Sequence, residues 1–302
     1  MSSTTTTRDC LMGLLEPRLD AQAAEYLGRQ LEEVRAGLSD TRFAALLSRA
    51  SRFSPRAPLA PSDEECAAAG SALEGWNPER WLILEAWRVA LVLARPDLAE
   101  LSAQLAIEEA FRFADEGEAR ALYRCLAHLP APERFAWRAG EGCRTNIVPV
   151  FEAVACDTPY AFRHFDDLAW NQLAIKAVFI DAPLWRVFGL DQRLSAELAR
   201  MALDLVDERR SAGRAVQHEL WLCLGEHGGA RGRDALLQEL EHGPEVGRRA
   251  AAVALVRAGE EELLERGLAG QSDEVVALAR AALEGACDQG VFRHLDPRGA
   301  VD

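Results

Sequence analysis

The stretch that decides the fold runs from residue 234 to residue 285 and reads DALLQELEHGPEVGRRAAAVALVRAGEEELLERGLAGQSDEVVALARAALEG. Leu236-Leu237 and Leu240 are echoed by Leu263-Leu264 and Leu268, in a repeat with offsets of 27 to 29 residues, and each half reads as a short helix, a Gly turn and an Ala-rich helix. A helix pair of this kind cannot bury its apolar stripe alone, so neighbouring pairs must stack. The repeat therefore predicts HEAT-like helix pairs at this end of the chain.

Apolar stripes at helical spacing continue upstream of the repeat. The segment NPERWLILEAWRVALVLARP, residues 77–96, has Asn77 as its expected cap and Pro78 at the first helical position. It is apolar on nearly all sides, which predicts a central helix. Helices predicted over 97–114 and 116–128 follow after a short turn, so they should be antiparallel neighbours. We therefore expect an all-α fold of stacked antiparallel helix pairs, a HEAT/ARM-like α-solenoid.

The composition supports an all-helical class and excludes several functions. Ala, Leu, Glu and Arg dominate, whereas β-branched residues are scarce. A formal net charge of -14 opposes long-range attraction to nucleic acid, so no nucleic-acid partner is expected. The seven cysteines are scattered without a CxxC pair, and no two histidines have metal-ligand spacing, so we expect no disulfide framework, metal or cofactor. No apolar run approaches the ~20 residues that cross a bilayer, which predicts a cytoplasmic protein that is not itself transmembrane.

The predicted organisation has four parts. A disordered Ser/Thr-rich tail is expected over residues 1–10, and a helical body over 11–227 contains a central polar segment at 143–214. The HEAT-like pairs span 228–290 and continue the body. A C-terminal tail covers 291–302.

Polar side chains interrupt the otherwise apolar segment DDLAWNQLAIKAVF, residues 166–179. Gln172 and Lys176 are four residues apart and share a helix face, and Asn171 flanks that face. Lys176 is the single lysine of the chain. Because an ammonium group is costly to bury without a partner, Lys176 must reach water, an acid or an anionic ligand. The ordinary alternative is a lysine at the edge of a core helix whose charged end reaches solvent.

A second polar group lies in RLSAELARMALDLVDERR, residues 193–210. Arg200 and Asp204 form an i,i+4 pair, which favours a solvated charge stripe of little energetic value. The alternative is a polar groove in which Arg193 and Arg200 bind a phosphate or a carboxylate.

A third group lies in GCRTNIVPVFEA, residues 142–153. Thr145 or Asn146 could cap a short helix with Pro149 in its first turns, and the free N–H groups there would suit an anion, although an ordinary capped turn explains the same residues. No residue is assigned a catalytic role. The predicted ligand-binding residues are Asn146, Glu152, Asn171, Gln172, Lys176, Arg193, Arg200 and Asp204.

Residues 122–221 resemble the EboA domain family, also called EboA-family metabolite traffic proteins. The residues that carry the resemblance are Thr145-Asn146, PVFEA at 149–153, WNQLAIKAVF at 170–179, GLDQR at 189–193, ELARM at 197–201 and AGR at 212–214. The resemblance implies a cytoplasmic helical protein encoded in a cluster with a membrane prenyltransferase. It also implies a part in moving a secondary-metabolite precursor.

Three hypotheses for the function remain open. The leading one is a non-catalytic metabolite-binding or scaffold protein, with a polar or phosphorylated small molecule and protein partners from the same gene cluster. The second is an enzyme acting on a sugar- or cyclitol-derived metabolite, with Lys176 as base or Schiff-base group and Glu152 as acid. The third is scaffolding through the repeats in residues 228–302.

Overall fold

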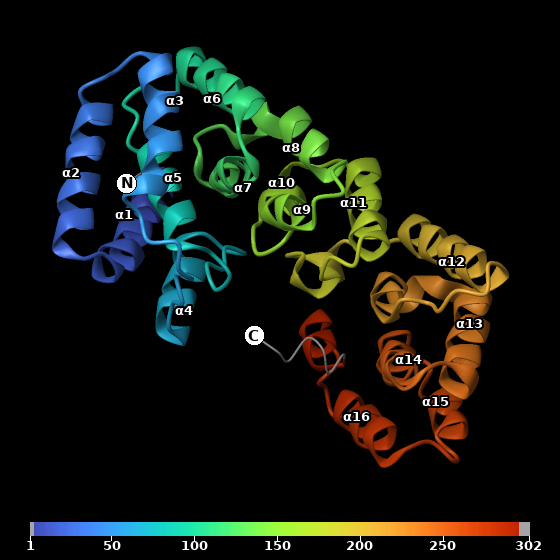
Figure 1. Ribbon diagram of the computed structural model, residues 1–302. Coiled ribbons are helices and arrows are strands. Elements are labelled where there is room, and N and C mark those ends of the chain that lie inside the picture. Colours follow the sequence, from blue (N-terminus) through green and yellow to red (C-terminus); the bar gives the residue numbers. More distant parts are fainter. Residues whose placement is uncertain (1–2, 296–302) are drawn as a thin grey trace. The chain divides into compact units, whose positions relative to one another are not determined.

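A computed structural model describes residues 3–295 of the chain (Figure 1). Within that range all regular elements are helices, no strand is formed, and one isolated antiparallel bridge joins Pro58 and Leu82. The predicted all-α class is therefore confirmed, whereas the HEAT/ARM-like superhelix stays a prediction. The chain divides into two compact units, Met1–Phe165 and Asp166–Asp302. This division falls inside the segment 143–214 that the sequence analysis treats as one polar centre.

The centre of the first unit is the helix α5, which packs against α1, α2 and α7. Every residue from 85 to 93 is buried, as the apolar character of this segment predicts. The helices of this unit are α1 (Ser3–Leu15), α2 (Ala21–Arg35), α3 (Asp40–Arg49), α4 (Asp63–Ala72), α5 (Ile83–Leu93), α6 (Leu101–Phe113), α7 (Glu116–Cys125), α8 (Ala136–Cys143), α9 (Val148–Ala155) and α10 (Tyr160–His164).

The predicted start of the central helix at Asn77 and Pro78 is wrong, because α5 begins at Ile83. Asn77 instead accepts a hydrogen bond from the backbone N–H of Glu79, as in a local turn. The backbone around Leu82 is extended and pairs with a distant segment: the Leu59 N–H donates to the Trp81 carbonyl at 2.7 Å. That long-range pairing delays the helix by more than one turn.

The predicted disordered tail over residues 1–10 is also wrong from Ser3 onward, since α1 begins there. Leu11, Leu14 and Leu15 are buried at its C-terminal end, and α1 packs against α4 and α5. Burial of this apolar end stabilises a helix whose first turns consist of residues with weak helix propensity. Residues 1–2 lie outside the described range.

The second unit combines two long helices with the predicted C-terminal pairs. The helix α13 packs on α14, and α14 packs on α16, as Figure 1 shows in the orange and red part of the chain. Of the predicted C-terminal tail, residues 291–294 belong to the short 3-10 helix η9 (Gln289–His294), and residues 296–302 lie outside the described range. The helices of this unit are α11 (Asp167–Phe179), α12 (Ala196–Ser211), α13 (Gly229–His242), α14 (Glu245–Arg257), α15 (Glu261–Gly267) and α16 (Asp273–Leu283).

Side-chain caps explain where α11 and α12 begin. Asp166 accepts a hydrogen bond from the Ala169 N–H at 2.8 Å, and Ser195 accepts one from the Leu198 N–H at 3.1 Å. Among residues 3–295, no helix is both long and apolar enough to cross a membrane.

Candidate functional site

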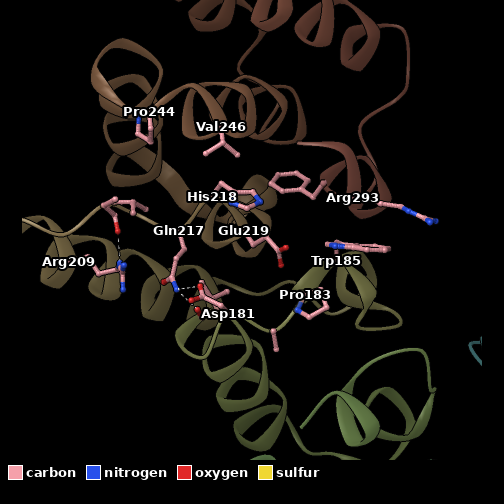
Figure 2. A pocket seen from close by; sticks show the side chains of 15 residues that line it. Asp181, Pro183, Trp185, Arg209, Gln217, His218, Glu219, Pro244, Val246 and Arg293 are labelled. Atoms are coloured by element: carbon pink, nitrogen blue, oxygen red, sulfur yellow. Dashed lines mark hydrogen bonds between the residues drawn. The ribbon is translucent and has the colours of Figure 1, made fainter. Parts of the chain in front are cut away.

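The second unit contains a pocket of about 550 Å³. Figure 2 shows the side chains that line it. They come from the end of α11 and the segment after it, the end of α12, the 3-10 helix η7 (His218–Cys223) with the residues before it, the start of α14, and η9. The lining residues are Val178, Asp181, Ala182, Pro183, Trp185, Arg209, Ala215, Val216, Gln217, His218, Glu219, Pro244, Val246, Phe292 and Arg293.

Gln217 ties the α11 wall of this pocket to the segment before η7. Its side-chain N–H group donates to the Val178 carbonyl at 2.6 Å and to Asp181 Oδ1 at 2.7 Å (Figure 2). Asp181 has a left-handed backbone, with φ of 58°, which ends α11 sharply and turns the chain toward Pro183. The amide nitrogen of Gln217 thus holds the turn against the end of the helix.

Glu219 and Gln289 hold the other walls. The carboxylate of Glu219 accepts a hydrogen bond from the Leu184 N–H. The amide of Gln289 donates to the carbonyls of Trp185 and Val187 at 2.6 and 2.9 Å. These contacts hold η9 against the segment around Trp185, although η9 lies about a hundred positions later in the sequence. Phe292 and Arg293 of η9 thereby line the pocket.

The polar lining carries both signs of charge. Asp181 and Glu219 supply carboxylates, and Arg209 and Arg293 supply guanidinium groups. The Arg209 Nε–H donates to the Ala215 carbonyl at 2.7 Å, and this hydrogen bond orients the guanidinium group of Arg209. The side-chain oxygen of Gln217 is buried beside the pocket and accepts no hydrogen bond from the described residues. The lining therefore offers donors and acceptors together, with formal charges that balance.

Aromatic rings complete the lining. The Arg293 guanidinium lies 5.8 Å from the centre of the Trp185 ring. The His218 and Phe292 rings are parallel to within 6°, with centroids 6.5 Å apart. Rings beside balanced polar groups suit a small organic molecule that has both apolar faces and polar edges.

None of the eight residues predicted from the sequence lines this pocket. On α11, Asn171 is buried, Gln172 is exposed and Lys176 is half-buried. The Lys176 ammonium lies 5.5 Å from the centre of the Phe179 ring, a cation–π contact at the end of its own helix. This position agrees with a lysine at the edge of a core helix.

The two predicted anion-binding arginines are engaged with carboxylates. Arg193 is 2.7 Å from Asp167 Oδ1, and its guanidinium carbon lies 4.7 Å from the centre of the Trp170 ring. Arg200 forms ion pairs with Glu197 at 2.7 Å and Asp204 at 2.5 Å, and its side chain is 54% exposed. The hydrogen bonds from Arg200 hold the pKa of Glu197 below its usual value. Arg200 therefore lies in a row of exposed ion pairs on α12.

The other two predicted residues belong to the first unit. Asn146 is exposed ahead of α9, and Glu152 is half-buried on that helix. Neither Thr145 nor Asn146 caps α9, which is a correction: the cap position is Ile147, and the Thr145 hydroxyl accepts a hydrogen bond from the Ile147 N–H instead. Pro149 lies in the first turn of α9, as predicted. The eight-residue site and its enzymatic alternative stay predictions.

One sequence feature marks the pocket. The polar triplet Gln217-His218-Glu219 directly precedes the apolar run LWLCL at 220–224. All three polar residues line the pocket, whereas Leu220, Trp221 and Leu222 are buried. Trp185 is half-buried at the pocket wall.

Comparison with known proteins identifies a family but no individual relative. No curated protein and no solved structure matches the chain. Residues 7–225 match the family described as Metabolite traffic protein EboA. The matched range includes the pocket wall from Val178 to Glu219, while Pro244, Val246, Phe292 and Arg293 follow it in the chain. Because this match covers most of the sequence, the chain belongs to the EboA metabolite traffic protein family.

Proposed function

We propose that the chain serves metabolite traffic as a non-catalytic binding protein, holding a small polar metabolite in the pocket between Asp181, Gln217 and Glu219. The family description supports a role in metabolite traffic. A cavity of about 550 Å³ is in the range that encloses small organic ligands. In this proposal the protein works in the cytoplasm with partners encoded in the same cluster, including a membrane prenyltransferase.

The balance of charges in the lining carries the proposal and favours a neutral, hydroxyl-bearing ligand. A hydroxyl group both donates and accepts, so it can use the carboxylates of Asp181 and Glu219 as well as the guanidinium of Arg209. A phosphate or carboxylate would be attracted by Arg209 and Arg293 but repelled by the two carboxylates, so the balanced lining gives an anion no net electrostatic gain. The Trp185 ring can cover an apolar face of the same ligand.

Native mass spectrometry tests this proposal. Wild-type protein is purified from cells that make the pathway's metabolites, or is incubated with the low-molecular-weight fraction of their extract. We expect one retained small molecule, and its loss in the variants Trp185→Ala and Glu219→Gln. Leu168→Ala is the matched control, because this residue is 65% exposed on α11 and does not line the pocket.

The mass of the retained molecule tests the ligand class as well. A neutral hydroxyl-bearing compound agrees with the proposal, whereas a phosphorylated one contradicts the argument from the balanced lining. Retention that is lost in Lys176→Met but unchanged in the two pocket variants would move the site to the residues predicted from the sequence. Protein that never retains a small molecule would contradict the binding role.

A further inference from the structure

The first unit has a second concave feature, a groove of about 260 Å³ between α3, α6 and α7. Its lining residues recur at helical spacing, so each helix presents one continuous face to it. On α6 this face runs from Ala106 to Phe113, which is about 10 Å of helix axis at 1.5 Å per residue. The lining residues are Asp40, Thr41, Ala44, Leu47, Ser48, Ala106, Glu109, Ala110, Phe113, Glu118 and Leu122.

The lining has an apolar floor, and all of its charged residues are acidic. Leu47, Ala106, Ala110 and Leu122 are buried and form the apolar part. The charged lining residues are Asp40, Glu109 and Glu118, and no lysine, arginine or histidine is among the lining residues.

Arginines outside the groove compensate this charge only in part. Arg95 lies 3.3 Å from Asp40, Arg88 lies 3.7 Å from Glu118, and Arg112 lies 3.8 Å from Glu109. The Asp40 and Glu109 side chains are 61% and 58% exposed in these pairs, so solvent weakens the attraction. Glu118 is only 13% exposed beside Arg88, so the acidic character that an entering molecule meets comes mainly from Asp40 and Glu109.

An exposed apolar ridge continues the groove along α6. Leu101, Leu105 and Phe113 are 64%, 60% and 73% exposed on one i,i+4 row of α6, which also carries Glu109 between Leu105 and Phe113. Single exposed apolar residues are ordinary on a protein surface, but three on one ridge beside a groove are typical of an interaction site.

We propose that a basic amphipathic helix of a partner protein docks in this groove. Its apolar residues, at i, i+4 and i+7, would cover Phe113 and the floor, as in other helix-in-groove complexes. Its lysine or arginine residues would face Asp40, Glu109 and Glu118. A second copy of this chain, with its formal charge of -14, and an anionic membrane both carry the wrong sign for this rim.

Fluorescence anisotropy with two model peptides tests this docking. The probes are labelled helical peptides with identical leucine positions, one with lysine and the other with glutamate at every polar position. We expect the full chain to bind the lysine peptide at least about tenfold more tightly, with affinity falling as salt is raised. The variants Phe113→Ser and Glu109→Lys should each weaken that binding about tenfold.

Trp137→Ser is the matched control for these variants. Trp137 is 66% exposed on α8 and lies outside the groove, so its loss should leave peptide binding unchanged. Circular dichroism checks that each variant is folded. Equal binding of the two peptides, or wild-type binding by both groove variants, would overturn the proposal.

Two further measurements examine the other possible occupants. Co-sedimentation with phosphatidylglycerol vesicles that depends on Phe113 would identify the ridge as a membrane surface instead. Sedimentation velocity that shows a dimer dissociated by Phe113→Ser would identify it as a contact between copies. We expect neither result, since both occupants are acidic.

Discussion

The guanidinium of Arg257 contacts both carboxylate oxygens of Asp191, at 2.5 and 3.2 Å. The two residues are 66 positions apart, and the same guanidinium also donates to the Cys287 carbonyl at 2.8 Å. Arg257 is at the end of α14, Asp191 is in the 3-10 helix η6 (Leu190–Gln192), and Cys287 precedes η9. One buried side chain therefore fastens two of the segments that position the pocket of the second unit.

Replacing Asp191 with asparagine should destabilise the second unit. The Arg257 side chain is only 7% exposed, so the variant leaves a buried guanidinium cation without its carboxylate partner. Because Asp191 is itself 33% exposed, we expect a loss of about 2 kcal/mol in the free energy of unfolding, at the lower end for such pairs. Urea unfolding followed by circular dichroism measures it. Asp207→Asn, in an exposed pair with Arg231, should cost less than about 0.5 kcal/mol, and equal effects of the two variants would contradict the argument.

The variant Glu85→Gln should destabilise the first unit more strongly. The Glu85 side chain is 2% exposed, lies 2.8 Å from Arg120 and 3.3 Å from Arg124, and accepts a hydrogen bond from the Leu82 N–H at the start of α5. The variant removes the buried anion between two guanidinium groups. We therefore expect the free energy of unfolding to fall by about 3–5 kcal/mol. Chemical denaturation measures the change, with Glu33→Gln as control: this side chain is 37% exposed in its pair with Arg42, and its loss should cost less than about 1 kcal/mol. A denaturation midpoint for Glu85→Gln equal to that of the wild type would show that the ion pairs of Glu85 with Arg120 and Arg124 do not stabilise the fold.

His128 should make the first unit sensitive to acid. Complete burial lowers the pKa of His128 from 6.5 to about 3, and its ring lies edge-on to Trp76 with centroids 4.7 Å apart. The unfolded chain binds a proton below pH 6.5 that the folded chain does not accept until about pH 3. Folding stability should therefore fall as the pH drops through this window.

The variant His128→Phe isolates this contribution. It removes the titrating group and keeps a ring of similar size beside Trp76. Between pH 6 and pH 4 its unfolding free energy should depend less steeply on pH than that of the wild type, by up to about 1.4 kcal/mol per unit. Parallel slopes for the two proteins would show that His128 takes up its proton in the folded state.

Two glycines of α8 should respond oppositely to alanine. A Cβ atom on Gly142 would lie 2.6 Å from the Tyr123 ring and 2.7 Å from Val154, so Gly142→Ala forces α8 away from α7 and α9 and should cost about 1–3 kcal/mol. A Cβ atom on Gly140 meets nothing within 4 Å, and Gly140→Ala should gain about 0.5–1 kcal/mol from helix propensity. Thermal unfolding of both variants measures the difference. A stabilised Gly142→Ala variant would contradict this packing of α8.

Local patterns predicted the fold where local interactions decide it. The caps at Asp166 and Ser195 are local features of this kind, because a cap needs only a side chain and a backbone N–H three residues later. The start of α5 could not be predicted in this way, since the extended backbone at Leu82 depends on pairing with the segment around Leu59. The Ser/Thr-rich start of α1 has weak propensity and is helical because the end of that helix is buried against α4 and α5.

The candidate site was harder to predict than the fold. The residues predicted from the sequence are polar side chains with unusual neighbours in the chain, and several of them, such as Arg200 and Asp204, form solvated ion pairs along one helix. The pocket residues do not stand out in the sequence. Trp185 and Glu219 line one pocket only because the fold brings their separate segments together. The hydrogen bonds from Gln289 to Trp185 and Val187 join positions that no spacing rule connects.

The sequence by itself determined the helical class, the capped starts of α11 and α12, and the membership of the EboA family, because each depends on neighbouring residues or on a continuous motif. Only the tertiary structure decided which side chains share a cavity. The pocket and the groove on α3, α6 and α7 both arise where distant segments pack against one another. That packing follows from the burial of apolar faces over the whole unit, so no single stretch of the chain contains it.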